Sequence, residues 1–184
     1  MIWVTSDWHF NHDREFIWKA RGFSSVEEMN NEIVRRHNAV IKPEDTLYIL
    51  GDVMLGGQND SGLEHIRAVN GNKIIIAGNH DTDRRREAYE KHLGIPVYDA
   101  LRIRYNGYHF YLSHFPTLTA NLEKESLKQC TLNLFGHTHQ KNNFHEDMPF
   151  MYHVGVDSHN CYPVSLDQAI LEMKEKVKEC ITQL

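Results

Sequence analysis

The chain has 184 residues, of which 41% are hydrophobic and 24% are charged, and this length suits one domain with one substantial core, so we expect residues 1–184 to form a single domain. No apolar run is long enough for a membrane span or a signal peptide, and the three cysteines show no C-x-x-C spacing, so we expect a cytoplasmic protein with reduced thiols. The net charge of -5 argues against a protein that coats nucleic acid, but it does not exclude a phosphate-bearing substrate, because carboxylates that bind cations present a positive site.

Short apolar runs alternate with helical patterns along the first half of the chain. The apolar runs predict strands at residues 2–4, 46–50 and 73–76. Helical spacing predicts helices at residues 12–21, from Ser25 to Pro43, at 62–69 and at 82–92. Ser25 stands three residues before Glu28, which is the spacing of a capping box. This alternation is typical of α/β layers.

The second half of the chain contains the clearest hairpin. Two β-rich runs, 97–105 and 108–113, are joined by Asn106-Gly107, a pair that suits a type I′ turn. The antiparallel pairing predicts a mixed architecture and not a purely parallel sheet. A weak helix near 118–128, strands at 131–135 and 150–156, and a last helix that begins at Ser165 are predicted to follow.

Polar side chains follow the predicted strands at the same relative place. An apolar run ends in Asp7-Trp8-His9, another in Gly51-Asp52, and a third in Gly78-Asn79-His80-Asp81. Because the ends of neighbouring strands meet at one edge of a sheet, we expect these side chains to converge. The strand-end residues collected in this way are Asp7, His9, Asp52, Asn79, His80, His114, His137 and His139.

These residues form a mixed nitrogen and oxygen donor set. Carboxylates, imidazoles and an amide oxygen suit divalent Mn, Fe, Zn or Ni, and no cysteine stands near enough in the motifs to suggest a thiolate site. A single tetrahedral ion needs fewer donors, so the set indicates two ions that share a bridging carboxylate. Such a pair clamps a phosphoryl group and lowers the pKa of a bridging water. Each short motif is common alone, and their joint occurrence in this order predicts the site.

Other polar and aromatic residues have simpler interpretations. A lone imidazole is usually packed or on the surface, which we expect for His37, His65, His92, His109, His145 and His153. Trp8 and Phe10 flank the first ligands, and either a base or aryl group stacks there or both side chains pack in the core. The triplet Arg84-Arg85-Arg86 is interpreted as a solvated helix face in preference to a substrate anchor.

The motifs resemble those of the calcineurin-like metallophosphoesterase superfamily. Its blocks appear here as Asp7-x-His9, Gly51-Asp52, Gly78-Asn79-His80-Asp81, His114 and Gly136-His137-Thr138-His139. The resemblance implies an α/β fold, a four-layer α/β/β/α sandwich of two mixed β-sheets flanked by helices, with a dinuclear metal site at the strand ends.

The same resemblance implies a role for each residue. One ion would be held by Asp7, His9, Asp52 and His139, and the other by Asp52, Asn79, His114 and His137. Asp52 would be the bridge. His80 would face the scissile phosphate and protonate the leaving oxygen, while Asp81 would orient the His80 imidazole. Further candidates for contacts to the substrate phosphate are Asn11, His12, Arg21 and His159.

The small size is similar to that of the compact bacterial, archaeal and phage-like phosphodiesterases of this superfamily. Protein serine/threonine phosphatases continue the second block with Asp-Arg-Gly, whereas here Val53 follows Asp52, so that activity is not expected. Many compact members have a glycine after the isolated histidine, and here Phe115 takes its place.

We therefore predict a phosphodiesterase that acts on a small phosphodiester, a nucleotide or an oligonucleotide, through attack by a metal-bridging hydroxide. The motifs do not separate this activity from that of a phosphomonoesterase on nucleotides or sugar phosphates. A catalytically silent metal-binding scaffold is disfavoured, because His80 and every ligand position are kept. The sequence leaves the native metals and the oligomeric state open.

Overall fold

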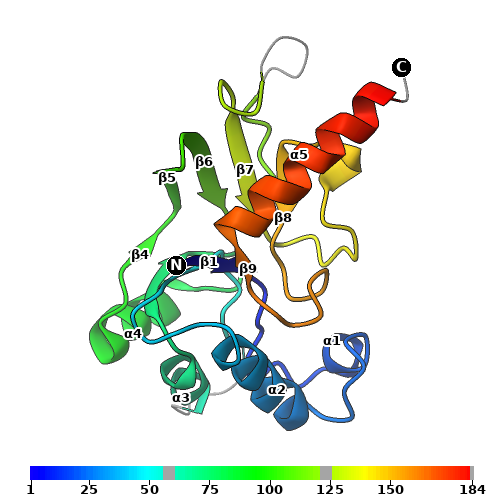
Figure 1. The fold of residues 1–184 in the computed structure, drawn as a ribbon. Coiled ribbons are helices and arrows are strands. Elements are labelled where there is room, and N and C mark those ends of the chain that lie inside the picture. Colours follow the sequence, from blue (N-terminus) through cyan, green and yellow to red (C-terminus); the bar gives the residue numbers. More distant parts are fainter. Residues whose placement is uncertain (56–60, 121–125, 183–184) are drawn as a thin grey trace.

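The computed structural model describes residues 1–55, 61–120 and 126–182, which form two mixed sheets flanked by helices (Figure 1). The first sheet has the order β4-β3-β2-β1-β9, in which β1 to β4 are parallel and β9 is antiparallel to β1. The second has the order β5-β6-β7-β8, in which only β5 is antiparallel to its neighbour. The expected pair of mixed sheets with flanking helices is therefore confirmed.

The strand bounds explain how the chain passes between the sheets. The strands of the first sheet are β1 (Ile2–Thr5), β2 (Thr46–Ile49), β3 (Asn72–Ile76), β4 (Val97–Tyr98) and β9 (Val164–Ser165). Those of the second sheet are β5 (Ala100–Tyr105), β6 (Tyr108–Ser113), β7 (Thr131–Phe135) and β8 (Met151–His153). The predicted run 97–105 is thus divided, because β4 pairs with β3 while β5 pairs with β6 in the hairpin at Asn106-Gly107.

The helices are α1 (Glu15–Trp18), α2 (Val26–Asn38), α3 (Ser61–Ala68), α4 (Asp83–Leu93) and α5 (Leu166–Thr182), with a short turn η1 (His145–Asp147). The Ser25 hydroxyl accepts a hydrogen bond from the Glu28 amide at 3.1 Å, which confirms this residue as the cap of α2. The predicted helix 12–21 shortens to α1. Of the weak helix predicted near 118–128, residues 118–120 and 126–128 are not helical, and residues 121–125 lie outside the described residues. None of the described helices has the length and apolar character needed to cross a bilayer.

Two apolar clusters hold the layers together. One packs α1 to α4 against the first sheet, with Ile33 and Tyr89 from helices meeting Ile75 of β3. The other fills the space between the sheets and includes Ile76 of β3, Phe110 of β6 and residues of α5. Successive side chains of β3 therefore point into different clusters, which explains its continuous apolar sequence.

The two sheets meet at the carboxyl ends of their parallel strands. A parallel bridge between Ser6 and Gly155 joins the extensions of β1 and β8, and a second bridge joins Phe10 to Met54 after β1 and β2. The loops that carry the predicted site residues follow β1, β2, β3, β6 and β7 at this junction. The fold thus brings polar loops from both sheets to one place.

Candidate metal centre

The backbone at this junction adopts unusual conformations. Positive φ angles of 58°, 50°, 52°, 68° and 48° occur at Asp7, His9, Asp52, His137 and His139. Residues other than glycine rarely adopt the left-handed region, and such strain concentrates at functional sites. The sharp turns aim these side chains at a common space.

Two glycines permit the close approach of the loops. A Cβ on Gly51, which has a φ of +85°, would lie 2.6 Å from the Gly78 backbone and from His114 Nδ1. A Cβ on Gly78 would lie 2.4 Å from Asp52 Oδ1. The glycines of the Gly-Asp and Gly-Asn-His motifs therefore make room for the polar side chains beside them.

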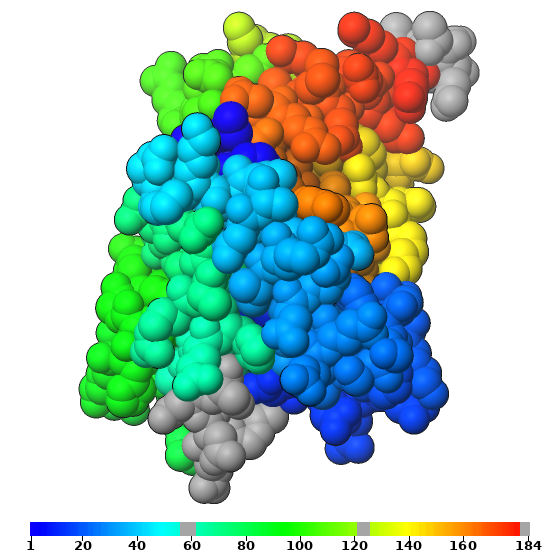
Figure 2. All heavy atoms as spheres, turned by 60° about the horizontal axis from the view of Figure 1, so that its bottom comes forward, coloured from blue at the N-terminus to red at the C-terminus, as the bar shows by residue number. Residues whose placement is uncertain are grey.

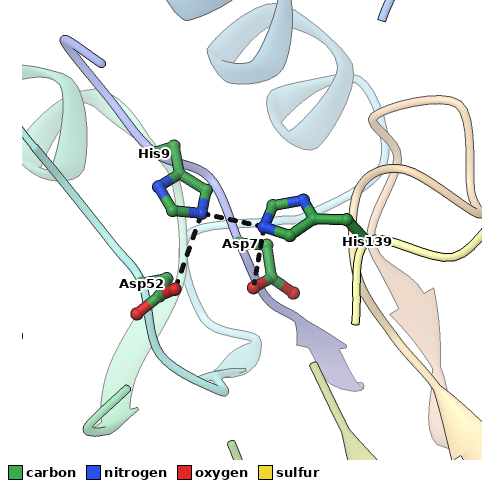
Figure 3. Close-up of side chains that lie close together, drawn as sticks. All are labelled: Asp7, His9, Asp52 and His139. Carbon is green, nitrogen blue, oxygen red and sulfur yellow. Dashed lines mark hydrogen bonds and ion pairs between the residues drawn. The ribbon is translucent and has the colours of Figure 1, made fainter. Parts of the chain in front are cut away.

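The first group of potential ligands comprises Asp7, His9, Asp52 and His139 (Figure 3). Each offers a donor atom within 4.8 Å of the others. His9 Nε2 lies 3.1 Å from His139 Nε2 and 3.6 Å from Asp52 Oδ2, and His139 Nε2 lies 3.9 Å from Asp7 Oδ1. This arrangement is suited to one divalent cation.

The second group shares Asp52 with the first. It adds His114 and His137, and His114 Nε2 lies 3.5 Å from Asp52 Oδ2. The Asn79 side-chain oxygen lies 2.8 Å from His114 Nε2 and 2.9 Å from His137 Nδ1. These four residues are those that the sequence predicted for a second ion, and Asp52 is the residue common to both groups.

The charges of the two groups are compatible with bound cations. Asp7 and Asp52 are buried, with exposed fractions of 0% and 2%, and within the described residues neither pairs with a lysine or an arginine. Burial raises the pKa of Asp7, and burial lowers the pKa of His9 to about 2, which keeps that imidazole neutral and its lone pair free for coordination. Buried carboxylates of this kind are paired or bind metal ions, so the donor set fits divalent ions.

A carboxylate that the sequence analysis overlooked positions His139. Asp157 Oδ2 lies 2.8 Å from His139 Nδ1, and Arg21 contacts both Asp157 oxygens, at 3.1 and 2.9 Å. Burial raises the pKa of Asp157, but the hydrogen bonds from His139 and Arg21 outweigh it and hold that pKa below its usual range. Asp157 follows β8 at the carboxyl end of the sheet, so the strand-end rule that found the other residues could have found it.

His80 lies beside the two groups of potential ligands and is exposed to solvent. Its side chain is 41% exposed, and its Nε2 lies 4.0 Å from Asp52 Oδ2. The His80 amide donates to Asp52 Oδ1 at 2.9 Å, and Arg85 donates to the His80 carbonyl at 2.5 Å. These backbone contacts fix His80 beside Asp52. They also give Arg85 a structural contact that the solvated-face interpretation missed.

Asp81 does not have the predicted role of orienting the His80 imidazole. Its carboxylate accepts hydrogen bonds from the amides of Asp52, Val53 and Gly78 at 2.8, 3.2 and 2.9 Å, and from the Tyr89 hydroxyl at 2.9 Å. No hydrogen bond from the His80 ring to Asp81 occurs in the described part of the chain. The buried Asp81 instead holds the loop that carries Asp52.

The predicted substrate contacts lie in different surroundings. His12 is half-buried and lines the pocket beside the first group. The Nδ1 atoms of His12 and His9 lie 3.3 Å apart. Arg21 also lines this pocket, but its guanidinium bonds to Asp157 and to the Asp7 and Trp8 carbonyls. Asn11 bonds with Asn30, and His159 bonds with the His153 carbonyl. Contacts of these four residues to substrate stay predictions.

The core interpretation holds for the aromatic residues beside the first ligands. Trp8 and Phe10 are 0% exposed, and Trp8 Nε1 donates to His37 Nε2 at 3.0 Å. The remaining histidines expected to be structural lie outside both candidate groups, with His153 buried and His92 on the surface. An aryl group of a substrate therefore cannot stack on Trp8 or Phe10.

The chain is similar to known proteins over most of its length. An uncharacterized protein of Methanocaldococcus jannaschii is 33% identical over 96% of this chain and 93% of its own length. The Gene 66 protein of Mycobacterium phage L5 is 29% identical over 85% of this chain and 86% of its own length. A crystal structure of a protein of unknown function from Aquifex aeolicus superposes with a TM-score of 0.70 at 28% identity, covering 93% of this chain and 98% of that one.

The family assignment follows from a match that spans nearly the whole sequence. The model of the calcineurin-like phosphoesterase superfamily domain matches residues 1–175, which include every candidate ligand. The same residues converge at the strand ends in the structure. The chain therefore belongs to the calcineurin-like phosphoesterase superfamily and is a metal-dependent phosphoesterase.

Proposed function

We propose that this protein is a phosphodiesterase that uses two divalent metal ions to hydrolyse a small, nucleotide-like phosphodiester. The observation that carries the proposal is that Asp52 belongs to both groups of potential ligands. One ion would be held by Asp7, His9, Asp52 and His139, and the other by Asp52, Asn79, His114 and His137. Bound ions of this kind neutralise phosphate oxygens and make a water molecule nucleophilic at neutral pH.

The chain's own residues prepare the site for in-line displacement. The Asp81 carboxylate accepts hydrogen bonds from the Tyr89 hydroxyl and from the Asp52 amide, and the second of these bonds fixes the backbone of Asp52. His80 lies beside Asp52 and is open to solvent, so a phosphate at the two groups can reach its imidazole. As water oxygen bonds to phosphorus and the ester P–O bond breaks, His80 would give a proton to the leaving oxygen.

The openness of the site favours a diester. A pocket of about 490 Å³ adjoins His9, His80 and His139, and it leaves room for a substituent on the phosphoryl group. Beside the second group, Phe115 is 50% exposed and packs edge-on to His137, with ring centroids 4.7 Å apart. A diester carries two substituents, and the pocket and the surface at Phe115 would receive one each.

The test compares a diester and a monoester of the same alcohol. Chelator-stripped protein is assayed with bis-p-nitrophenyl phosphate and with p-nitrophenyl phosphate after addition of Mn, Ni, Zn, Mg or no metal. Metal-restored cleavage that favours the diester supports the proposal. Metal-restored cleavage that favours the monoester would replace it with a phosphomonoesterase, and no cleavage with any metal would favour a non-catalytic scaffold.

A further inference from the structure

A pocket opens directly beside the first group of potential metal ligands. Its volume of about 490 Å³ lies within the range of about 300–1,000 Å³ that is usual for small-molecule sites. One wall consists of His9, His80 and His139, so a phosphoryl group held at the metal ligands would extend its substituent into this space. The other lining residues come from the α1 region and from the loops after β7 and β8, namely His12, Phe16, Ile17, Ala20, Arg21, Lys141 and Asp157.

Phe16 is placed differently from its neighbours in α1. Ile17 and Trp18 are each 9% exposed and join the core, whereas Phe16 is 69% exposed at the pocket. The Phe16 ring lies edge-on to His12 at 5.8 Å between centroids, and the His12 ring lies 6.3 Å from that of His80. An aromatic wall thus runs from the candidate catalytic histidine to the outer edge of the pocket.

Of the two cationic side chains that line this pocket, Arg21 is engaged inside the protein and Lys141 lies at the surface. Arg21 forms a bidentate pair with Asp157, and its side chain is 2% exposed. The Lys141 side chain is 63% exposed, and its Nζ lies 3.9 Å from Asp157 Oδ1 and 3.5 Å from the Ala20 carbonyl. Besides Lys141, the exposed surface that the pocket offers a substituent is mainly that of Phe16 and Ala20, because Ile17 is 9% exposed.

Two segments that are distant in the sequence both line this pocket. Figure 2 shows the blue segment around α1 beside the yellow segment near residues 140–150, and the hydrogen bond from Lys141 to Ala20 joins them. A flat ring that packs against the exposed Phe16 phenyl group gains stacking energy without the loss of a charged group's hydration. An uncharged planar substituent meets these conditions.

We propose that this pocket seats an aromatic ring carried by the phosphoester substrate, such as a nucleobase, and that Phe16 stacks on it. The inference rests on the proposed function, because it takes the phosphoryl group to lie at the metal ligands. It assigns to Phe16 the stacking role that the buried Trp8 and Phe10 cannot perform. Phe16 is therefore a specificity-determining residue that separates nucleotides from phosphoesters without a ring.

The experiment measures ligand binding by calorimetry on the Mn-loaded protein. Adenosine 5′-monophosphate and ribose 5-phosphate share the phosphate and the sugar, so the ratio of their dissociation constants isolates the base. The wild-type protein is expected to bind the nucleotide more tightly. Phe16→Ala should reduce this preference by about 5-fold or more and leave the binding of ribose 5-phosphate unchanged.

Two further variants control the result. Phe16→Tyr keeps an aromatic face and should keep the preference, and Leu171→Ala removes another exposed apolar side chain, which is 56% exposed on α5, and should change nothing. Equal binding of the two ligands, a preference that survives Phe16→Ala, or no binding of either ligand would overturn the inference. A Phe16-dependent preference in a protein that cleaves no diester would contradict the proposed function and leave the ring pocket in place.

Discussion

His139 Nδ1 lies 2.8 Å from Asp157 Oδ2, and this contact turns His139 Nε2 toward Asp7 and His9. The Nδ1 atom donates its proton to the carboxylate, so the lone pair on Nε2 faces the first group of potential ligands. Burial lowers the pKa of His139, but the hydrogen bond to Asp157 and the nearby carboxylates raise it above its usual value. Arg21 anchors Asp157 and the backbone of Asp7 together, which couples the loops after β1, β7 and β8.

Asp157→Asn tests this coupling. The amide keeps the shape of the side chain but removes the charge that orients His139, so we expect metal affinity to fall by about 10- to 100-fold. Competition with a fluorescent chelator measures the affinity, and thermal melts confirm folding. The control Asp99→Asn neutralises a carboxylate that is 87% exposed and should have no effect. Unchanged affinity in Asp157→Asn would show that the contact does not position a ligand.

Asp52→Ala should remove the carboxylate that both groups share. We expect loss of bound metal and of phosphoesterase activity, because neither group keeps its full donor set without Asp52. Elemental analysis of the purified protein measures the metal, with the exposed Glu175→Ala as the matched control. A variant that stays fully loaded would exclude Asp52 as the bridge.

His80→Ala should separate catalysis from metal binding. His80 contacts Asp52 through its backbone amide and belongs to neither group of potential ligands, so we expect the variant to keep its metal. Turnover should fall by about a hundredfold or more if the imidazole is the general acid. The control is His92→Ala at an exposed position of α4. Loss of metal from His80→Ala would instead make His80 a ligand.

His37 should make the fold sensitive to acid. Burial lowers the pKa of His37 to about 3 from its usual value of 6.5, so between these values the unfolded chain takes up a proton that the folded protein excludes. Stability should therefore fall as the pH drops from about 6.5 toward 3, by up to about 1.4 kcal/mol per pH unit from this group.

Urea unfolding at several pH values measures this dependence. His37→Gln removes the titrating group, so its free energy of unfolding should decline less steeply with acid, although the loss of packing lowers its stability at pH 7. The exposed His92→Gln should follow the wild type. Identical slopes for the wild type and His37→Gln would contradict the buried neutral imidazole.

The candidate ligands could be predicted from the sequence because local rules place them. Each follows an apolar strand, and Gly51, Gly78 and Gly136 mark where loops approach closely. The shared face at the strand ends then follows from parallel pairing. Asp157 also follows a strand, β8, but it lies outside the motifs from which the other residues were collected, so it was overlooked.

Features that depend on distant contacts were predicted less well. The division of residues 97–105 at Asp99 depends on pairing with β3 and β6, which no local pattern records. The role of Asp81 was wrong because its oxygens are directed at the Asp52 loop and at Tyr89. Whether Trp8 and Phe10 face a substrate or pack in the core depends on tertiary burial, and the core buries both.

The central claim is that Asp52 links two metal sites, and native mass spectrometry of chelator-stripped protein during Mn addition tests it most directly. We predict a final state with two ions per chain in the wild type and loss of both in Asp52→Ala. A wild-type protein that saturates with one ion, or an Asp52→Ala variant that still binds two, would contradict the dinuclear account.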